Sequence, residues 1–130
     1  MDTIFAQASA PGRAGVSVVR ISGPQAFAIT QSIAGKRPKG RETVLRALRG
    51  ADGEVIDQAL VLSFVGPHSF TGEDVVELHL HGSIAVVRAV LDLLGTFHDT
   101  RMAEAGEFTR RALENEKLDL AQVEGLADLI

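Results

Sequence analysis

Residues 70–83, which read as a turn, an extended strand and the start of a helix, constrain the fold more than any other stretch. Along residues 75–81 apolar and polar side chains alternate, so Val76, Leu78 and Leu80 share one side of the strand. The other side carries a carboxylate and two imidazoles. This alternation predicts a strand with one face in a core and one face in contact with water.

The polar side consists of Glu77, His79 and His81, and Gly82-Ser83 then predicts the start of a helix. The amides at a helix N-terminus carry partial positive charge, so this place suits a polar ligand. The competing interpretation is an ordinary solvated face of an antiparallel sheet. A metal hydrolase that uses these three side chains is a further alternative. We expect no metal, because the sequence has no second cluster of ligands.

Composition limits the classes of protein that remain. The chain has 130 residues, of which 45% are hydrophobic, enough for one domain with a core. The net charge of -4 argues against binding nucleic acid over the whole surface. The absence of cysteine excludes disulfides, thiolate zinc sites and a cysteine nucleophile. With no membrane span or targeting segment in the pattern, we expect a cytoplasmic protein that binds no membrane.

Basic residues concentrate between positions 36 and 49, while acidic residues dominate from Asp99 onwards. We interpret the basic segment as a solvated loop and strand edge, where Lys and Arg discourage edge pairing. The alternative is a tRNA-binding module that acts through this 36–49 segment. The basic residues of the segment are Lys36, Arg37, Lys39, Arg41, Arg46 and Arg49.

The order of the predicted elements favours an α+β fold, with a mixed β-sheet of about five to six strands and flanking helices. Strands are predicted over residues 3–8, 16–21, 43–48, 55–65 and 75–81, with a short one near 101–103. Helices are predicted over residues 26–33, 83–94 and 106–113, and again from 119 onwards.

Local signals add three expectations. Ser22 is expected to cap the first helix, with Gln25 closing a capping box. Phe108, Ala112 and Leu113 are expected to form the apolar side of the third helix. The last amphipathic helix still runs when the chain ends, which indicates the front part of a longer protein or a helix that docks on another chain.

Arg20 lies on a strand that is otherwise apolar and therefore needs a partner. Either its side chain extends to solvent from a sheet edge, or it meets an anion or a carboxylate at the sheet surface. No motif for nucleotide phosphates accompanies it, because Gly35-Lys36 lacks the other positions of a P-loop.

Taken together, the motifs resemble the N-terminal domain of the MnmE (TrmE) family of tRNA-modification GTPases. They cover almost the whole chain, in order and at matching spacing. The motifs are Asp2-Thr3-Ile4, Pro11-Gly12-Arg13, Arg20-Ile21-Ser22-Gly23-Pro24, Ser69-Phe70-Thr71-Gly72-Glu73-Asp74, His81-Gly82, Gly106-Glu107-Phe108-Thr109 and Lys117-Leu118-Asp119-Leu120-Ala121-Gln122.

The resemblance implies a fold like the tetrahydrofolate-binding domain of the glycine-cleavage T-protein. Residues 1–118 would form a domain that binds folate and dimerises, and residues 119–130 would begin a truncated central helical domain. GTP, Mg²⁺ and K⁺ would belong to a G domain outside these residues. We therefore expect the chain to be inactive as an enzyme on its own.

The function implied is modification of the wobble uridine of tRNA (U34, at carbon 5) by a homodimer together with the flavoprotein MnmG. A reduced folate, 5-formyl- or 5,10-methylene-tetrahydrofolate, would supply the one-carbon unit. The family's folate contacts fall on Arg20, Glu77 and Lys117, and no catalytic residue is expected. A carboxylate such as Glu77 can accept the 2-amino group and ring N–H of a pterin. Arg20 and Lys117 would meet the ring carbonyl, the one-carbon region or the glutamate tail, to which Arg13 or the 36–49 segment would add charge.

Overall fold

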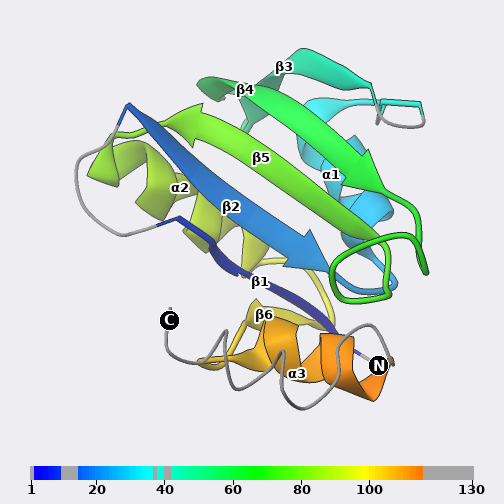
Figure 1. The fold of residues 1–130 in the computed structure, drawn as a ribbon. Coiled ribbons are helices and arrows are strands. Elements are labelled where there is room, and N and C mark those ends of the chain that lie inside the picture. The colour runs from blue at the N-terminus through cyan, green and yellow to red at the C-terminus, as the bar shows by residue number, and fades with distance from the viewer. Residues whose placement is uncertain (1, 10–14, 37, 40–41, 116–130) are drawn as a thin grey trace.

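The computed structural model describes residues 2–9, 15–36, 38–39 and 42–115, which form a six-stranded sheet and three helices (Figure 1). The strands are β1 Thr3–Gln7, β2 Val16–Ser22, β3 Thr43–Arg49, β4 Val55–Phe64, β5 Val75–His81 and β6 Thr100–Met102. The helices are α1 Ala26–Ala34, α2 Ile84–Leu94 and α3 Glu107–Glu114. The predicted α+β class and the number of strands are confirmed.

The sheet has the order β3-β4-β5-β2-β1-β6, so the alternating strand β5 lies near its middle. Neighbouring strands are antiparallel except β1 and β6, which run parallel. The basic segment supplies β3, which is an edge strand, as the interpretation of its charges predicts. In the described part of the chain, Lys36, Lys39 and Arg49 are exposed.

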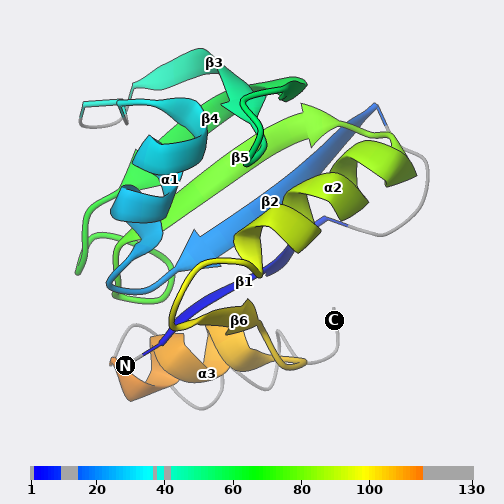
Figure 2. The same cartoon turned by 180° about the vertical axis from the view of Figure 1, so that it is seen from behind.

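Helices α1 and α2 cover one face of the sheet, as the view from behind shows (Figure 2). The predicted alternation of β5 is confirmed, because Val76, Leu78 and Leu80 lie in the core beneath these helices. Val19 and Ile21 of β2 join them from the neighbouring strand. Burial of this apolar surface is the main driving force for folding, at roughly 25 cal/mol per Å².

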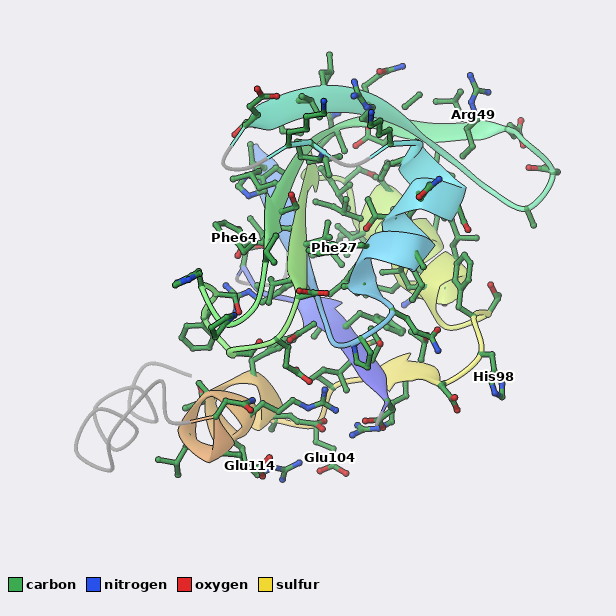
Figure 3. All side chains as sticks on the ribbon, turned by 90° about the vertical axis from the view of Figure 1, so that its right-hand side faces the viewer. Phe27, Arg49, Phe64, His98, Glu104 and Glu114 are labelled. Atoms are coloured by element: carbon green, nitrogen blue, oxygen red, sulfur yellow. The ribbon has the colours of Figure 1, made fainter. Side chains whose placement is uncertain are left out.

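The opposite side of the sheet, called the open face below, is not covered by α1 or α2, and α3 lies only at its β6 edge (Figure 1). Seen from the side, Phe64 of β4 lies on this face, whereas Phe27 of α1 lies on the side of the helices (Figure 3). Cross-strand neighbours share a face, so the pairs Leu60–His79 and Arg20–Glu77 place these four residues on the open face.

Helix α2 begins and ends as the sequence predicts, but α1 does not begin as predicted. Ser83 accepts the Val86 amide at the start of α2. At α1 the N-cap is Gln25, with no side-chain cap, so the predicted capping box is wrong. Ser22 is still part of β2, and its hydroxyl binds the Thr71 hydroxyl at 2.7 Å instead.

Helix α3 lies beside β6, at one edge of the sheet (Figures 1 and 2). Its predicted apolar side is wrong in part. Ala112 is buried, but Leu113 is exposed, and Glu107, Thr109 and Arg111 are buried with Ala112. The reason is that α3 packs against charged side chains of other elements, which satisfy its own charges.

The loop between β4 and β5, residues 65–74, closes tightly on itself. A side chain at Gly66 would place Cβ 2.7 Å from the Gly72 carbonyl oxygen, so only glycine fits there. The Gly66 amide donates to the Asp74 carboxylate at 2.9 Å, and the Ser69 hydroxyl donates to the Glu73 carbonyl. The closed loop fixes the side chains that precede β5, Phe70 among them.

Candidate functional site

Arg20 and Glu77 form an ion pair on the open face. Antiparallel pairing of β2 and β5 places the two residues opposite each other. Arg20 donates from Nε and Nη2 to Glu77 Oε2, at 3.1 and 3.0 Å. The side chains are 23% and 19% exposed, so the pair is partly desolvated but open to a ligand. Of the two interpretations of Arg20, a carboxylate partner at the sheet surface is confirmed.

The two histidines of β5 have different partners. His79 lies 3.3 Å from Glu77, between Nε2 and Oε1. The His81 ring instead pairs with Asp57, with 2.7 Å between Nδ1 and Oδ1, and its side chain is mostly exposed. Glu77, His79 and His81 therefore do not converge, and the described ranges contain no group of three or more such side chains that could hold a metal. The structure gives the metal-hydrolase alternative no support.

Two aromatic rings contact the Arg20 guanidinium. Its central carbon lies 5.2 Å from the centroid of Phe70 and 5.3 Å from the centroid of Phe108. Phe70 comes from the loop before β5, and Phe108 from the first turn of α3. Attraction between a cation and an aromatic face contributes about 0.5–2 kcal/mol each, the larger values applying when water is excluded.

A cavity of about 310 Å³ opens beside this arginine. Its size is at the small end of the range for small-molecule sites. Arg20, Phe70 and Phe108 line one part of it, and Gln7 adds a polar group from β1. The remaining lining residues are Ala6, Ala8, Ala103, Glu104, Ala105, Gly106 and Thr109. Apolar walls with a few polar groups are typical of ligand sites.

An ionic cluster of Asp2, Glu73, Arg101, Glu107 and Arg111 attaches α3 to the rest of the domain. Arg111 Nη1 donates to both carboxylate oxygens of Glu73 at 3.1 Å, and Nη2 donates to Asp2 Oδ1 at 2.6 Å. Arg101 donates from Nη1 and Nη2 to the carboxylate of Glu107, which is 2% exposed. These bonds place α3, and with it Phe108, next to Arg20.

The pKa values of Glu107 and Asp2 in the ionic cluster are both lowered. Hydrogen bonding from Arg101 lowers the pKa of Glu107 to about 2, with help from the Glu104 amide. Hydrogen bonding from Arg101 and from Arg111 also lowers the pKa of Asp2. The shifts follow the general rule that donors to a carboxylate favour its ionised form.

The structure brings together Arg20 and Glu77 of the predicted site residues, while Lys117 and Arg13 lie outside the described residues. Sequence reasoning missed Phe70 and Phe108 as neighbours of Arg20. Both belong to motifs that carry the family resemblance, Ser69-Phe70-Thr71 and Gly106-Glu107-Phe108, but no local pattern indicates that the two rings contact Arg20. Their contact depends on the positions of the loop and α3 in the fold.

A second cavity, of about 610 Å³, lies between α2 and β6, and none of the predicted site residues lines it. Ile84, Val87 and Leu91 make most of it apolar, with Arg88 and Asp92 beside them. The smaller cavity is the better candidate site, because charged and aromatic groups converge there.

The sequence matches the family described as the N-terminus of the GTP-binding protein TrmE over residues 3–117. The chain belongs to this family. Its α+β fold, with a six-stranded mixed sheet, is consistent with a TrmE N-terminal domain. The resemblance drawn from the motifs is confirmed.

Curated relatives of this TrmE N-terminal domain carry the name "tRNA modification GTPase MnmE". The protein from Roseobacter denitrificans is 68% identical over 130 residues, covering 100% of this chain and 30% of the relative. The relatives from Dinoroseobacter shibae and Ruegeria sp. are 59% and 55% identical, with the same coverage. The chain thus spans about 30% of the length of these relatives.

Within the described ranges, each helix is too short or too polar to span a membrane.

Proposed function

We propose that the chain binds a reduced folate through Arg20, Glu77 and Lys117. The observation that carries the proposal is the Arg20–Glu77 pair, whose arginine lines a cavity together with two aromatic rings. A folate offers a flat pterin with hydrogen-bond donors and acceptors on its edge, and carboxylates at its other end. A half-buried carboxylate, a guanidinium and aromatic walls are complementary to such a molecule.

In this proposal Glu77 accepts hydrogen bonds from the pterin, although it already binds protein donors. Its Oε2 atom accepts from Arg20, and its Oε1 atom lies 3.3 Å from His79. An ionised carboxylate has about four lone-pair sites, so each oxygen can accept another donor. The two hydrogen bonds from Arg20 hold the carboxylate in one orientation before the ligand arrives. Such preorganisation reduces the entropic cost of binding.

We place the domain in a longer protein that works on tRNA. As in the family, it would serve a GTPase that modifies the wobble uridine (U34, carbon 5) together with the flavoprotein MnmG, in the cytoplasm. Its relatives, which share 55–68% identity and are named as tRNA modification GTPases, support this context. The folate, as 5-formyl- or 5,10-methylene-tetrahydrofolate, would provide the one-carbon unit.

Self-association as a homodimer is the second part of the proposal. The open face of the sheet supports it, since Leu45 and Leu60 pair across β3 and β4 there and are 59% and 44% exposed. Exposed apolar side chains on a face without a covering helix are typical of protein interfaces. A two-fold dimer through this face would also bring two Arg20–Glu77 pairs into one assembly.

Isothermal titration calorimetry with 5-formyl-tetrahydrofolate tests the folate proposal. The chain should bind, and Glu77→Gln should weaken binding by about 1.5–3 kcal/mol, because hydrogen bonds to a charged group are lost. Glu54→Gln is the matched control, since this exposed residue lies in the turn between β3 and β4. No heat of binding in a sample shown to be dimeric, or equal losses in both variants, would contradict the proposal.

A further inference from the structure

Two aromatic rings from separate parts of the chain contact the Arg20 guanidinium, and the proposed folate site uses them only as walls of the cavity. Phe70 and Phe108 are 38 positions apart (108 − 70), yet their ring centroids both lie within 5.3 Å of the Arg20 central carbon. Phe70 is 39% exposed, which is unusual for a large aromatic side chain. Packing in the core therefore does not account for its position.

The segments that carry the two rings are joined to each other by polar bonds. Arg111, one helical turn after Phe108, donates to the Glu73 carboxylate at 3.1 Å. Asn115 donates from Nδ2 to the Thr71 carbonyl at 2.9 Å. Both acceptors belong to the loop that carries Phe70. The loop and α3 are thus fixed relative to each other close to the two rings that contact Arg20.

We propose that Phe70 and Phe108 are positioning residues, which hold the Arg20 guanidinium in one orientation for its ligand. The inference rests on the proposed folate function, of which it describes the arginine part. Contacts with two rings restrict rotation of the guanidinium. Nε and Nη2 are already committed to Glu77 Oε2.

The remaining donors of Arg20 define the ligand group that fits. Arg20 lines the cavity, and within the described part of the chain its Nη1 group donates to no acceptor. Guanidinium donors lie in a plane, so a planar oxygen acceptor in that plane is the best partner. On a folate such an acceptor is the ring carbonyl or a carboxylate of the tail. An ammonium or hydroxyl group would gain less from a guanidinium held in this way.

Substitutions of Phe108 test the inference, because they separate ring chemistry from volume. Phe108→Leu keeps an apolar side chain without an aromatic face, whereas Phe108→Tyr keeps the face. Phe27→Leu, on the other side of the sheet, is the matched control. We expect Phe108→Leu to weaken 5-formyl-tetrahydrofolate binding about fivefold, and the other two variants to stay within about twofold.

A second measurement does not depend on the ligand. The Nε–H signal of Arg20 in ¹H–¹⁵N NMR spectra of the full chain should be shifted by the rings and slow to exchange with water. Phe108→Leu should remove the part of the shift that comes from the Phe108 ring and should raise the exchange rate, while Phe108→Tyr and Phe27→Leu leave both unchanged.

The outcomes separate the two proposals. An unchanged Arg20 signal and affinity in Phe108→Leu would overturn the positioning role, as would equal losses in Phe108→Leu and Phe108→Tyr. If the unsubstituted chain binds no folate, the proposed function fails, and the Arg20 signal still decides whether the rings position the arginine. If Phe108→Leu does not fold, Phe70→Leu provides the same test from the exposed loop.

Discussion

Arg111 of α3 donates two hydrogen bonds of 3.1 Å to the carboxylate of Glu73, in the loop before β5. The two side chains are 8% and 10% exposed, so this ion pair is almost fully desolvated. Ser22 at the end of β2 donates to the same carboxylate at 2.8 Å. One carboxylate therefore joins a strand, a loop and a helix that are distant in the sequence.

Removing the charge of Arg111 should destabilise the fold strongly. Arg111→Met leaves Glu73 buried without its cation, which typically costs about 3–5 kcal/mol. Chemical denaturation followed by circular dichroism measures the free energy of unfolding. Arg110→Met is the matched control, because the neighbouring arginine is half exposed and its ion pairs are long. A decrease of less than about 1 kcal/mol in the free energy of unfolding of Arg111→Met would show that the ion pair contributes little to stability.

The stability of the chain should fall in acid partly through Glu107. Its pKa is lowered to about 2 in the folded chain by the hydrogen bond from Arg101. Because the pKa is lowered on folding, ionised Glu107 contributes its full stabilisation at pH values above its ordinary pKa of 4.5. This contribution is lost as the pH falls through about 2. The shift corresponds to about 3 kcal/mol.

Denaturation measured between pH 7 and pH 2 checks this contribution. Glu107→Gln should be less stable at pH 7 and should lose less stability on acidification than the unsubstituted chain. Glu114→Gln, on an exposed position of the same helix, should keep the original slope. Parallel pH profiles for all three proteins would refute the assignment of this stability to Glu107.

Replacing Gly66 should also be costly, for a steric reason. Gly66→Ala forces Cβ to within 2.7 Å of the Gly72 carbonyl oxygen, which is backbone and cannot move freely. We expect a loss of about 1–3 kcal/mol, measured by thermal or chemical denaturation. Gly15→Ala is the control, because no atom lies within 4 Å of the added Cβ there. Equal stability of both variants would show that the loop can accommodate the added methyl group without loss of stability.

The proposed homodimer predicts a specific effect of charge on the open face. Leu60→Asp should shift the chain to monomers in sedimentation velocity, because the carboxylate would be buried without a partner. Ile84→Asp tests a comparably exposed apolar residue on the side of the helices and should remain dimeric. A dimer that persists in Leu60→Asp would place the interface elsewhere.

Most of the sheet could be predicted from the sequence because strand periodicity is local. The alternation of Val76, Leu78 and Leu80 with polar residues depends only on neighbours in the chain, and it gave the buried face of β5 correctly. Ser83 as the cap of α2 follows from equally local chemistry. Motifs added the family, which periodicity alone could not supply.

The predictions that were wrong involve partners far apart in the sequence. Ser22 has the residue type of a helix cap, but Thr71 and Glu73 compete for its hydroxyl. The predicted apolar side of α3 did not include Arg111, which is buried because it binds Asp2, 109 residues away in the sequence. Whether a charged side chain is buried depends on such distant partners. A short segment of the sequence contains only one of the two partners, so it cannot predict the contact. The role of Lys117 stays a prediction.

The way α3 is attached has a consequence for how the domain opens. Detaching this helix exposes mainly charged groups, which water solvates well. It exposes little aliphatic surface, so the heat-capacity change of this local opening is small. Urea then has little effect on it, because the denaturant slope follows the surface exposed. In native-state hydrogen exchange, the amides of α3 should exchange through a urea-insensitive local opening, while those of β5 exchange only with global unfolding. Helix α3, which carries Phe108, is thus expected to open separately from the sheet.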